Sequence, residues 1–393
     1  MSATPWPMPD PPDRERFAQL SDARPTETPL PPAAPVRAVP AAGQLMVIDD
    51  RGVFVRGPHR PARADDRSAS VETVLEGTVL EGTVLEQTAQ TSRTAEQIDG
   101  GPIAVYVHGL AGNSTNFDSV GSVLATYARG YAIDLPGFGR SDPPPGERYS
   151  LDDDAEIVTQ VIRRLSPLQS VHLVGNSLGG MVCILVASRH PELIASLTLI
   201  SPAVPDLRLT TDRGADPRLG LLLAPGTTGL AVRRLGGIDA QQRAQGMAAL
   251  CYGDPSSLTA EDVAAAAVEL RWRFPLRWVH TSTIESMRAL MRSYLRVGRR
   301  SFRTITASVT VPTLVIWGTK DRLVDCSLAP ATAAAFQQSR LLVLAGCGHV
   351  AQMERPDATA RAVLALWEDV DTDAADAGEP RSTRVPIVAP STA

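Results

Sequence analysis

From Pro102 onward, short apolar runs rich in β-branched residues alternate with longer stretches of helical patterning. This alternation is typical of parallel strands joined by crossover helices, because a parallel strand is buried on both faces and reads as a continuous apolar run. It predicts an α/β fold with a doubly wound, mostly parallel sheet. The predicted central strands are residues 103–107, 131–135, 171–175, 197–201, 313–317 and 341–345.

Two other segments carry explicit local signals. Residues 44–56 alternate apolar and polar side chains around Asp50, Arg51 and Gly52, which predicts a strand or a hairpin arm. Residues 151–165 are predicted to form a helix, because Ser150 can cap its start. Acidic residues follow at its positive end and arginines lie at its negative end, as the helix dipole favours.

The spacing of these elements divides the chain. About a hundred residues of helical patterning separate the strands at 197–201 and 313–317, far more than the roughly 2 to 6 residues of an ordinary connection, so we expect a helical cap inserted at 203–305. The core should then comprise residues 45–202 and 306–370, with a variable loop at about 60–100 that contains the repeat TVLEG. The proline-rich residues 1–44 and the tail 371–393 lack a sustained apolar face, which predicts disorder in both.

The strongest motif is Gly-Asn-Ser-Leu-Gly at residues 175–179, which lies between a predicted strand and an apolar helical segment at 181–188. This is the context of a G-x-S-x-G nucleophile elbow, in which a serine occupies a sharp, strained turn. The flanking glycines are needed because side chains there would collide with the helix and the neighbouring strand. The motif therefore marks Ser177 as the candidate nucleophile.

Serine needs a base to accept its proton and a third group to orient that base. Asp321 follows the predicted strand 313–317, and His349 follows the predicted strand 341–345, so both should lie at the same edge of the sheet as Ser177. Asp325 is a rival acid, but Asp321 is favoured because it lies closer to the strand end. His108 is interpreted as a residue that orders its loop, and Cys183 and Cys347 as structural.

Taken in this order, the motifs at Gly109, Ser177, Asp321 and His349 resemble those of the α/β-hydrolase family over roughly residues 100 to 370. The resemblance implies an oxyanion hole made by the backbone N–H groups of Leu110 and Leu178. Residues 134–142 are similar to a structural loop of that family.

The resemblance implies a serine hydrolase that cleaves a carboxylic ester or related acyl substrate through an acyl-enzyme intermediate, with water as the second substrate. A serine rather than an aspartate at the elbow disfavours the epoxide-hydrolase and dehalogenase branches. One alternative is hydrolysis of a carbon–carbon bond, because Asn176 and residues 347–352 look similar to hydrolases of ring-cleavage products. Another is a non-catalytic binding protein on a hydrolase scaffold.

Two features of the insert bear on substrate. Trp272, Phe274 and Trp278 could line an apolar substrate pocket, although we favour the interpretation that they pack the cap on the core. Arginines recur at helical spacing along residues 288–299, which indicates either a solvated helix face or a surface that attracts an anionic substrate or a partner. The basic face consists of Arg288, Arg292, Arg296 and Arg299.

Composition limits the other classes of function. The formal net charge of −5 disfavours a nucleic-acid partner, and no apolar run is long enough for a membrane span. The four cysteines show no metal-ligand spacing and suit a reducing compartment. Proline interrupts the first twenty residues, where a signal peptide would be continuous and apolar. We therefore expect a cytoplasmic protein without a metal or cofactor.

Overall fold

A computed structural model of the chain describes residues 41–60, 101–206 and 239–376. The TVLEG repeat and most of the two terminal segments lie outside these residues. No helix in the described ranges is long and apolar enough to cross a membrane.

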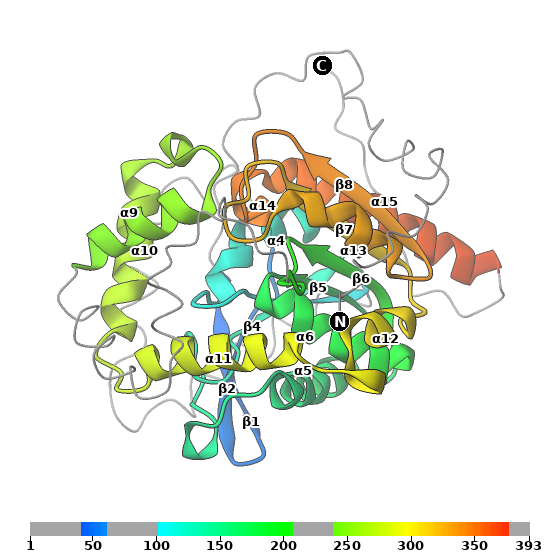
Figure 1. Cartoon of the computed structure of the whole chain (residues 1–393), viewed down its shortest axis with the longest axis horizontal. Helices are drawn as coiled ribbons and strands as arrows, with labels where there is room; N and C mark the ends of the chain where they lie inside the picture. The colour runs from blue at the N-terminus through cyan, green and yellow to red at the C-terminus, as the bar shows by residue number, and fades with distance from the viewer. Residues whose placement is uncertain (1–40, 61–100, 207–238, 377–393) are drawn as a thin grey trace, which may run out of the picture.

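One eight-stranded sheet forms the centre of the molecule (Figure 1), in the order β1-β2-β4-β3-β5-β6-β7-β8. The strands from β3 to β8 pair in parallel, and β1 and β2 pair antiparallel at one edge. The mostly parallel sheet predicted from the sequence is therefore confirmed. The strands are β1 (Gly43–Ile48), β2 (Arg51–Arg56), β3 (Ile103–Val107), β4 (Arg129–Ile133), β5 (Val171–Asn176), β6 (Ile194–Ile200), β7 (Thr313–Gly318) and β8 (Ser339–Leu344).

Strand β4 ends two residues earlier than predicted. Asp134 and Leu135 are buried although they lie beyond the strand, so burial continues past the end of β4. The carboxylate of Asp134 accepts hydrogen bonds from the N–H groups of Ser114 (2.6 Å) and Arg140 (2.8 Å). Burial alone thus misplaced the strand boundary.

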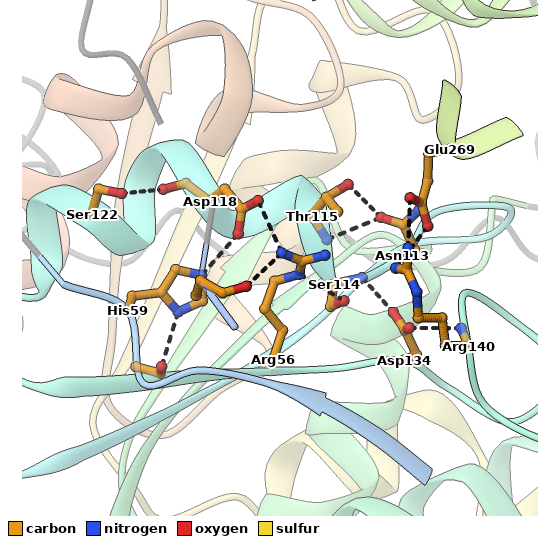
Figure 2. A network of polar contacts seen from close by, with 12 residues as sticks. Arg56, His59, Asn113, Ser114, Thr115, Asp118, Ser122, Asp134, Arg140 and Glu269 are labelled. Atoms are coloured by element: carbon orange, nitrogen blue, oxygen red, sulfur yellow. Dashed lines mark hydrogen bonds and ion pairs between the residues drawn. The ribbon is translucent and has the colours of Figure 1, made fainter. Parts of the chain in front are cut away.

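Strands β1 and β2 form the predicted hairpin, with its turn at Asp49 and Asp50, both at positive φ. The expected turn at residues 50–52 was one residue late, since Arg51 already belongs to β2. Residues 43 and 44, which were expected to belong to a disordered segment 1–44, are part of β1. Figure 2 shows how the end of β2 and the segment after it are fixed. Arg56, the last residue of β2, and His59 both contact the carboxylate of Asp118.

Helices cover both faces of the sheet and enclose two apolar cores. Helices α5, α6 and α13 contribute to one core, and α4 and α15 contribute to the other. Ser150 caps α5 as predicted, since its side chain accepts a hydrogen bond from the N–H of Asp153 (3.2 Å). The core helices are α4 (Asp118–Leu124), α5 (Leu151–Leu165), α6 (Leu178–Arg189), α13 (Ala329–Ala334), α14 (Ala351–Glu354) and α15 (Pro356–Asp376).

Helix α15 runs to Asp376, so residues 371–376, which were expected to belong to a disordered tail, are helical. The hydroxyl of Tyr127 donates a hydrogen bond to Asp371. A tertiary contact of this kind stabilises a helical end that is rich in Asp and Ala and has no apolar pattern of its own.

Between β6 and β7, which are neighbours in the sheet, the chain forms the helices of the insert. Figure 1 shows α9 and α10 grouped to one side of the sheet and α11 running back toward α5 and α6. These helices are α9 (Ala240–Cys251), α10 (Ala260–Arg273), α11 (Val279–Tyr294) and α12 (Phe302–Ala307).

The predicted basic face on this insert is partly used within the fold. Arg288 pairs with Glu285 on the same helix, and Arg296 donates to Asp152 of α5 at 2.5 Å. Asp152 also pairs with Arg189, and the arginines lower its pKa against the effect of burial. Arg296 therefore ties the insert to the core, whereas Arg292 and Arg299 of the same face are exposed.

His172 on β5 makes stability sensitive to acid. Its ring stacks on that of Trp367 with 4.4 Å between centroids, and its Nδ1 lies 2.8 Å from Ser196 Oγ. Burial lowers the pKa of His172 from 6.5 to about 3, so the unfolded chain binds a proton at a pH where the folded protein does not. The neutral ring thus contributes stability above pH 6.5 that is lost as the pH falls toward about 3.

We expect the free energy of unfolding to fall by about 1.4 kcal/mol per pH unit below pH 6.5, relative to the His172→Phe variant. Phenylalanine keeps an aromatic ring against Trp367 but cannot titrate. Urea unfolding of both proteins at a series of pH values measures this difference, and other titrating groups cancel in the comparison. Parallel pH dependences of the two proteins would contradict the prediction.

Candidate active site

Ser177 occupies a sharp turn between β5 and α6. Its backbone has φ 53° and ψ −118°, a conformation that is strained for any residue with a side chain. The turn is held because the Ser177 N–H donates to the carbonyl of Ile200 (3.0 Å) and its carbonyl accepts from the N–H groups of Met181 (3.2 Å) and Ala203 (3.0 Å). The predicted nucleophile elbow is therefore present as a local structure.

The two glycines of the motif allow close packing around this turn. A Cβ on Gly175 would lie 2.6 Å from both the Cys183 sulfur and the Gly179 carbonyl oxygen. A Cβ on Gly179 would lie 2.3 Å from the carbonyl oxygen of Val107 and 2.5 Å from that of His108. Because backbone atoms cannot move aside cheaply, any larger residue at either position would push α6 away from the sheet.

His349 and Asp321 meet at the ends of β8 and β7. His349 Nδ1 lies 2.8 Å from Asp321 Oδ2, and the two side chains are 5% and 0% exposed. The other oxygen of Asp321 accepts hydrogen bonds from the N–H groups of Leu323 (2.9 Å) and Val324 (3.0 Å). These donors fix the orientation of the carboxylate toward the imidazole.

The rival acid, Asp325, has another role. Its carboxylate accepts a hydrogen bond from the N–H of Ser327 (2.8 Å) and caps the short 3-10 helix at Cys326–Leu328. The structure therefore brings Asp321, rather than Asp325, to His349.

Asn176 joins the serine turn to the histidine loop. Its side-chain nitrogen donates to the carbonyl of His349 (3.1 Å) and to that of Ile200 (3.0 Å), and the residue is buried. The sequence singled out Asn176 only through its resemblance to hydrolases of ring-cleavage products. Its position shows a direct physical role, because one side chain links the loops that carry Ser177 and His349.

The loop after β3 lies against Ser177. A Cβ on Gly109 would lie 3.0 Å from the Cβ of Ser177, so a larger residue there would force the serine turn to shift by a few tenths of an ångström. Within the described residues, the N–H groups of Leu110 and Leu178 have no backbone acceptor. These are the two donors predicted to form the oxyanion hole.

His108 orders this loop, as predicted. Its Nδ1 lies 2.7 Å from the Gly109 carbonyl oxygen, and its Nε2 accepts a hydrogen bond from the N–H of Leu135 (3.0 Å). This pattern requires a neutral ring with the proton on Nδ1. Burial lowers the pKa of His108 to about 4, which keeps the ring neutral near pH 7.

Glu354 on α14 was not recognised from the sequence. Its carboxylate accepts hydrogen bonds from the N–H groups of Gly348 (2.7 Å), Gly253 (3.0 Å) and Asp254 (3.1 Å). The N–H of His349 in turn donates to the carbonyl of Cys251 (2.7 Å). The end of α9 is thus joined to the loop that carries His349, and no sequence spacing signals this contact between residues about a hundred positions apart.

The aromatic residues of the insert lie in different environments. Trp272 is 42% exposed and lies under the guanidinium of Arg140, at 4.8 Å from its ring centroid. Phe274 lies under that of Arg243 at 3.8 Å and lines a cavity of about 400 Å³ together with His280. Trp278 precedes α11 and is half-buried. Ser177 does not line this cavity. A role in substrate binding therefore stays a prediction for Phe274, as it does for Trp272 and Trp278.

Comparison with known proteins identifies the family of the chain. Residues 102–356 match the α/β hydrolase fold family. The chain belongs to this family. As an α/β hydrolase, it is similar to solved structures such as a membrane phospholipase A described as a bacterial virulence factor. That structure is 21% identical, has a TM-score of 0.58 and aligns over 84% of this chain and 86% of its own.

Among sequence relatives, this α/β hydrolase is 27% identical to the monoacylglycerol lipase abhd6-A of Xenopus laevis, over 65% of this chain and 72% of the relative. It is also 27% identical to a 2-hydroxy-6-oxononadienedioate/2-hydroxy-6-oxononatrienedioate hydrolase of Cupriavidus pinatubonensis, over 67% of this chain and 86% of the relative. The relatives thus include both an ester hydrolase and a hydrolase of the class considered as an alternative above.

Proposed function

We propose that this α/β hydrolase is a serine hydrolase that cleaves a carboxylic ester through an acyl-enzyme intermediate. The observation that carries the proposal is the 2.8 Å contact between His349 and Asp321. Asn176 links the loop of His349 to the strained turn of Ser177. A nucleophile, a base and an orienting acid on adjoining loops are the groups that acyl transfer requires.

In the proposed first step, Ser177 Oγ attacks the carbonyl carbon and its proton passes to His349 Nε2. Asp321 keeps the other imidazole proton on Nδ1, so that Nε2 has a free lone pair. The N–H groups of Leu110 and Leu178 stabilise the oxyanion. Collapse of the tetrahedral intermediate breaks the ester C–O bond, and His349 returns the proton to the departing alcohol.

In the second step, His349 removes a proton from water, which attacks the acyl carbon. The carboxylic acid then leaves and Ser177 regains its proton. The insert would act as a cap over this site, with Trp272, Phe274 and Trp278 as candidate contacts for the substrate. The similarity to a monoacylglycerol lipase favours an acyl ester as the substrate class.

A second candidate is hydrolysis of a carbon–carbon bond in a ring-cleavage product. Asn176 favours it, as does the similarity to a 2-hydroxy-6-oxononadienedioate hydrolase that this chain covers over 86% of its length. The same nucleophile and base would serve either reaction, so the substrate has to distinguish them.

A fluorophosphonate probe and a substrate panel test the proposal. We expect the probe to modify Ser177, as located by mass spectrometry of peptides, because an activated serine displaces fluoride from phosphorus. The panel would compare p-nitrophenyl esters of increasing chain length with a 2-hydroxy-6-oxo-dienoate, and the esters should be hydrolysed with the larger kcat/KM.

Faster hydrolysis of the dienoate would favour hydrolysis of a carbon–carbon bond over ester hydrolysis as the function. Failure of the folded protein to react with the probe or with any member of the panel would contradict both activities. That result would favour a non-catalytic binding protein.

A further inference from the structure

Arg273, in the last turn of α10, contacts the loop that carries the proposed oxyanion donor Leu110. The residue is only 4% exposed, although it belongs to the insert. Its Nη1 donates to the carbonyl oxygens of Ala111 and Gly112, each at 3.3 Å. A buried cation from one part of the chain thus binds two consecutive carbonyls of another part.

The peptide group between Ala111 and Gly112 is held on both sides. Its carbonyl binds Arg273, and its N–H donates to the carbonyl of Gly109 at 3.0 Å. Ala111 has φ 59°, a left-handed conformation that is strained for a residue with a side chain. A conformation of this kind persists only where neighbouring groups enforce it, and Arg273 is such a group.

The charge of Arg273 is supported by one carboxylate of the core and one of its own helix. Burial lowers its pKa, whereas the nearby carboxylates of Asp134 and Glu269 raise it. Glu269 is itself fixed by Arg140, with nitrogen–oxygen distances of 3.1 and 3.3 Å, as Figure 2 shows. Helix α10 is therefore attached beside the loop at two places, and the guanidinium has acidic neighbours that offset part of its desolvation.

The geometry points to Arg273 as a positioning residue of the oxyanion hole. By binding the carbonyls of Ala111 and Gly112, Arg273 sets the orientation in which the Leu110 N–H meets the substrate oxygen beside Ser177. This inference rests on the proposed function. It assigns the insert a part in catalysis besides the selection of substrate, because docking of α10 completes the oxyanion hole.

Arg273→Met tests the inference, because methionine keeps apolar bulk without charge or donors. We expect kcat on the preferred p-nitrophenyl ester to fall about 10²-fold, the lower end of the loss caused by removing one oxyanion donor, while KM changes little. A boronic acid with the same acyl chain, which forms a tetrahedral adduct with an activated serine, should lose affinity in parallel. Arg273→Lys keeps the charge and one donor and should lose less.

Arg296→Met is the matched control, because it also removes an arginine that joins the insert to the core, through Asp152 and away from the oxyanion loop. It should keep the kcat and boronic-acid affinity of the wild type. The inference is overturned if Arg273→Met behaves like Arg296→Met in both measurements, or if it raises KM alone. Should Arg273→Met fail to fold, the same comparison applies to Arg273→Lys.

Reaction of the wild type with the fluorophosphonate probe separates the two proposals. A wild type that reacts, together with an Arg273→Met variant of unchanged kcat, would overturn only the role of Arg273. A wild type that does not react would overturn the proposed function itself.

Discussion

Replacing Ser177 with alanine should lower kcat on the preferred ester by about 10⁶-fold, as removal of the nucleophile does in serine hydrolases. The substitution deletes one oxygen from a half-buried side chain at the end of β5. Alanine accepts the same strained backbone about as poorly as serine does, so the melting temperature should change little. Steady-state hydrolysis of the p-nitrophenyl ester and thermal unfolding measure the two effects.

Ser188→Ala is a suitable control for this experiment. Ser188 lies near the other end of α6, and its Oγ is 2.7 Å from that of Ser308. The control should retain full activity and react with the fluorophosphonate probe. An active Ser177→Ala variant would show that the nucleophile is another group and would remove the acyl-enzyme mechanism proposed above.

Asp321→Asn should lower kcat/KM by about 10⁴-fold, the loss expected when the orienting acid of a triad becomes an amide. The structure dictates how the new side chain lies. The N–H groups of Leu323 and Val324 need an acceptor, so the amide oxygen must take the place of Oδ1. The amide nitrogen then points at His349 Nδ1 as a donor.

Facing this donor, His349 must carry its proton on Nε2, where it can no longer accept the proton of Ser177. The rate of fluorophosphonate labelling should fall together with kcat/KM. Asp325→Asn is the control, because Asp325 is four residues away and its carboxylate caps a short helix. Equal losses in the two variants would contradict the assignment of Asp321 as the orienting acid.

The positions of most strands along the chain and the local context of the catalytic candidates could be predicted because both depend on short-range patterns. The apolar runs found β3, β5 and β7 nearly to the residue, since these strands are buried on both faces. At β4 the same reasoning failed, because Leu135 is buried as a loop residue. Apolar side chains indicate burial. The end of an apolar run coincides with the end of a strand only where burial also ends at that residue.

Contacts between distant segments could not be predicted in the same way. Arg273 and Glu354 look in the sequence like ordinary surface charges on helices. The carbonyls that Arg273 binds are more than 160 residues away, and two of the three N–H groups that Glu354 binds are about 100 residues away. A carbonyl or an N–H carries no signature in the sequence. The arginine spacing over residues 288–299 likewise gave no sign of the ion pair between Arg296 and Asp152, which come within reach of each other only after folding.

The junction between the end of α9 and the histidine loop has a consequence for protein engineering. The two backbones touch so closely that a Cβ on Gly348 would lie 2.3 Å from the carbonyl oxygen of Cys251. A Cβ on Gly253 would lie 2.2 Å from that of Gly346. A chimera that receives its cap from a homologue to change specificity must therefore keep residues 251–254 together with 346–349, and the graft should avoid this junction.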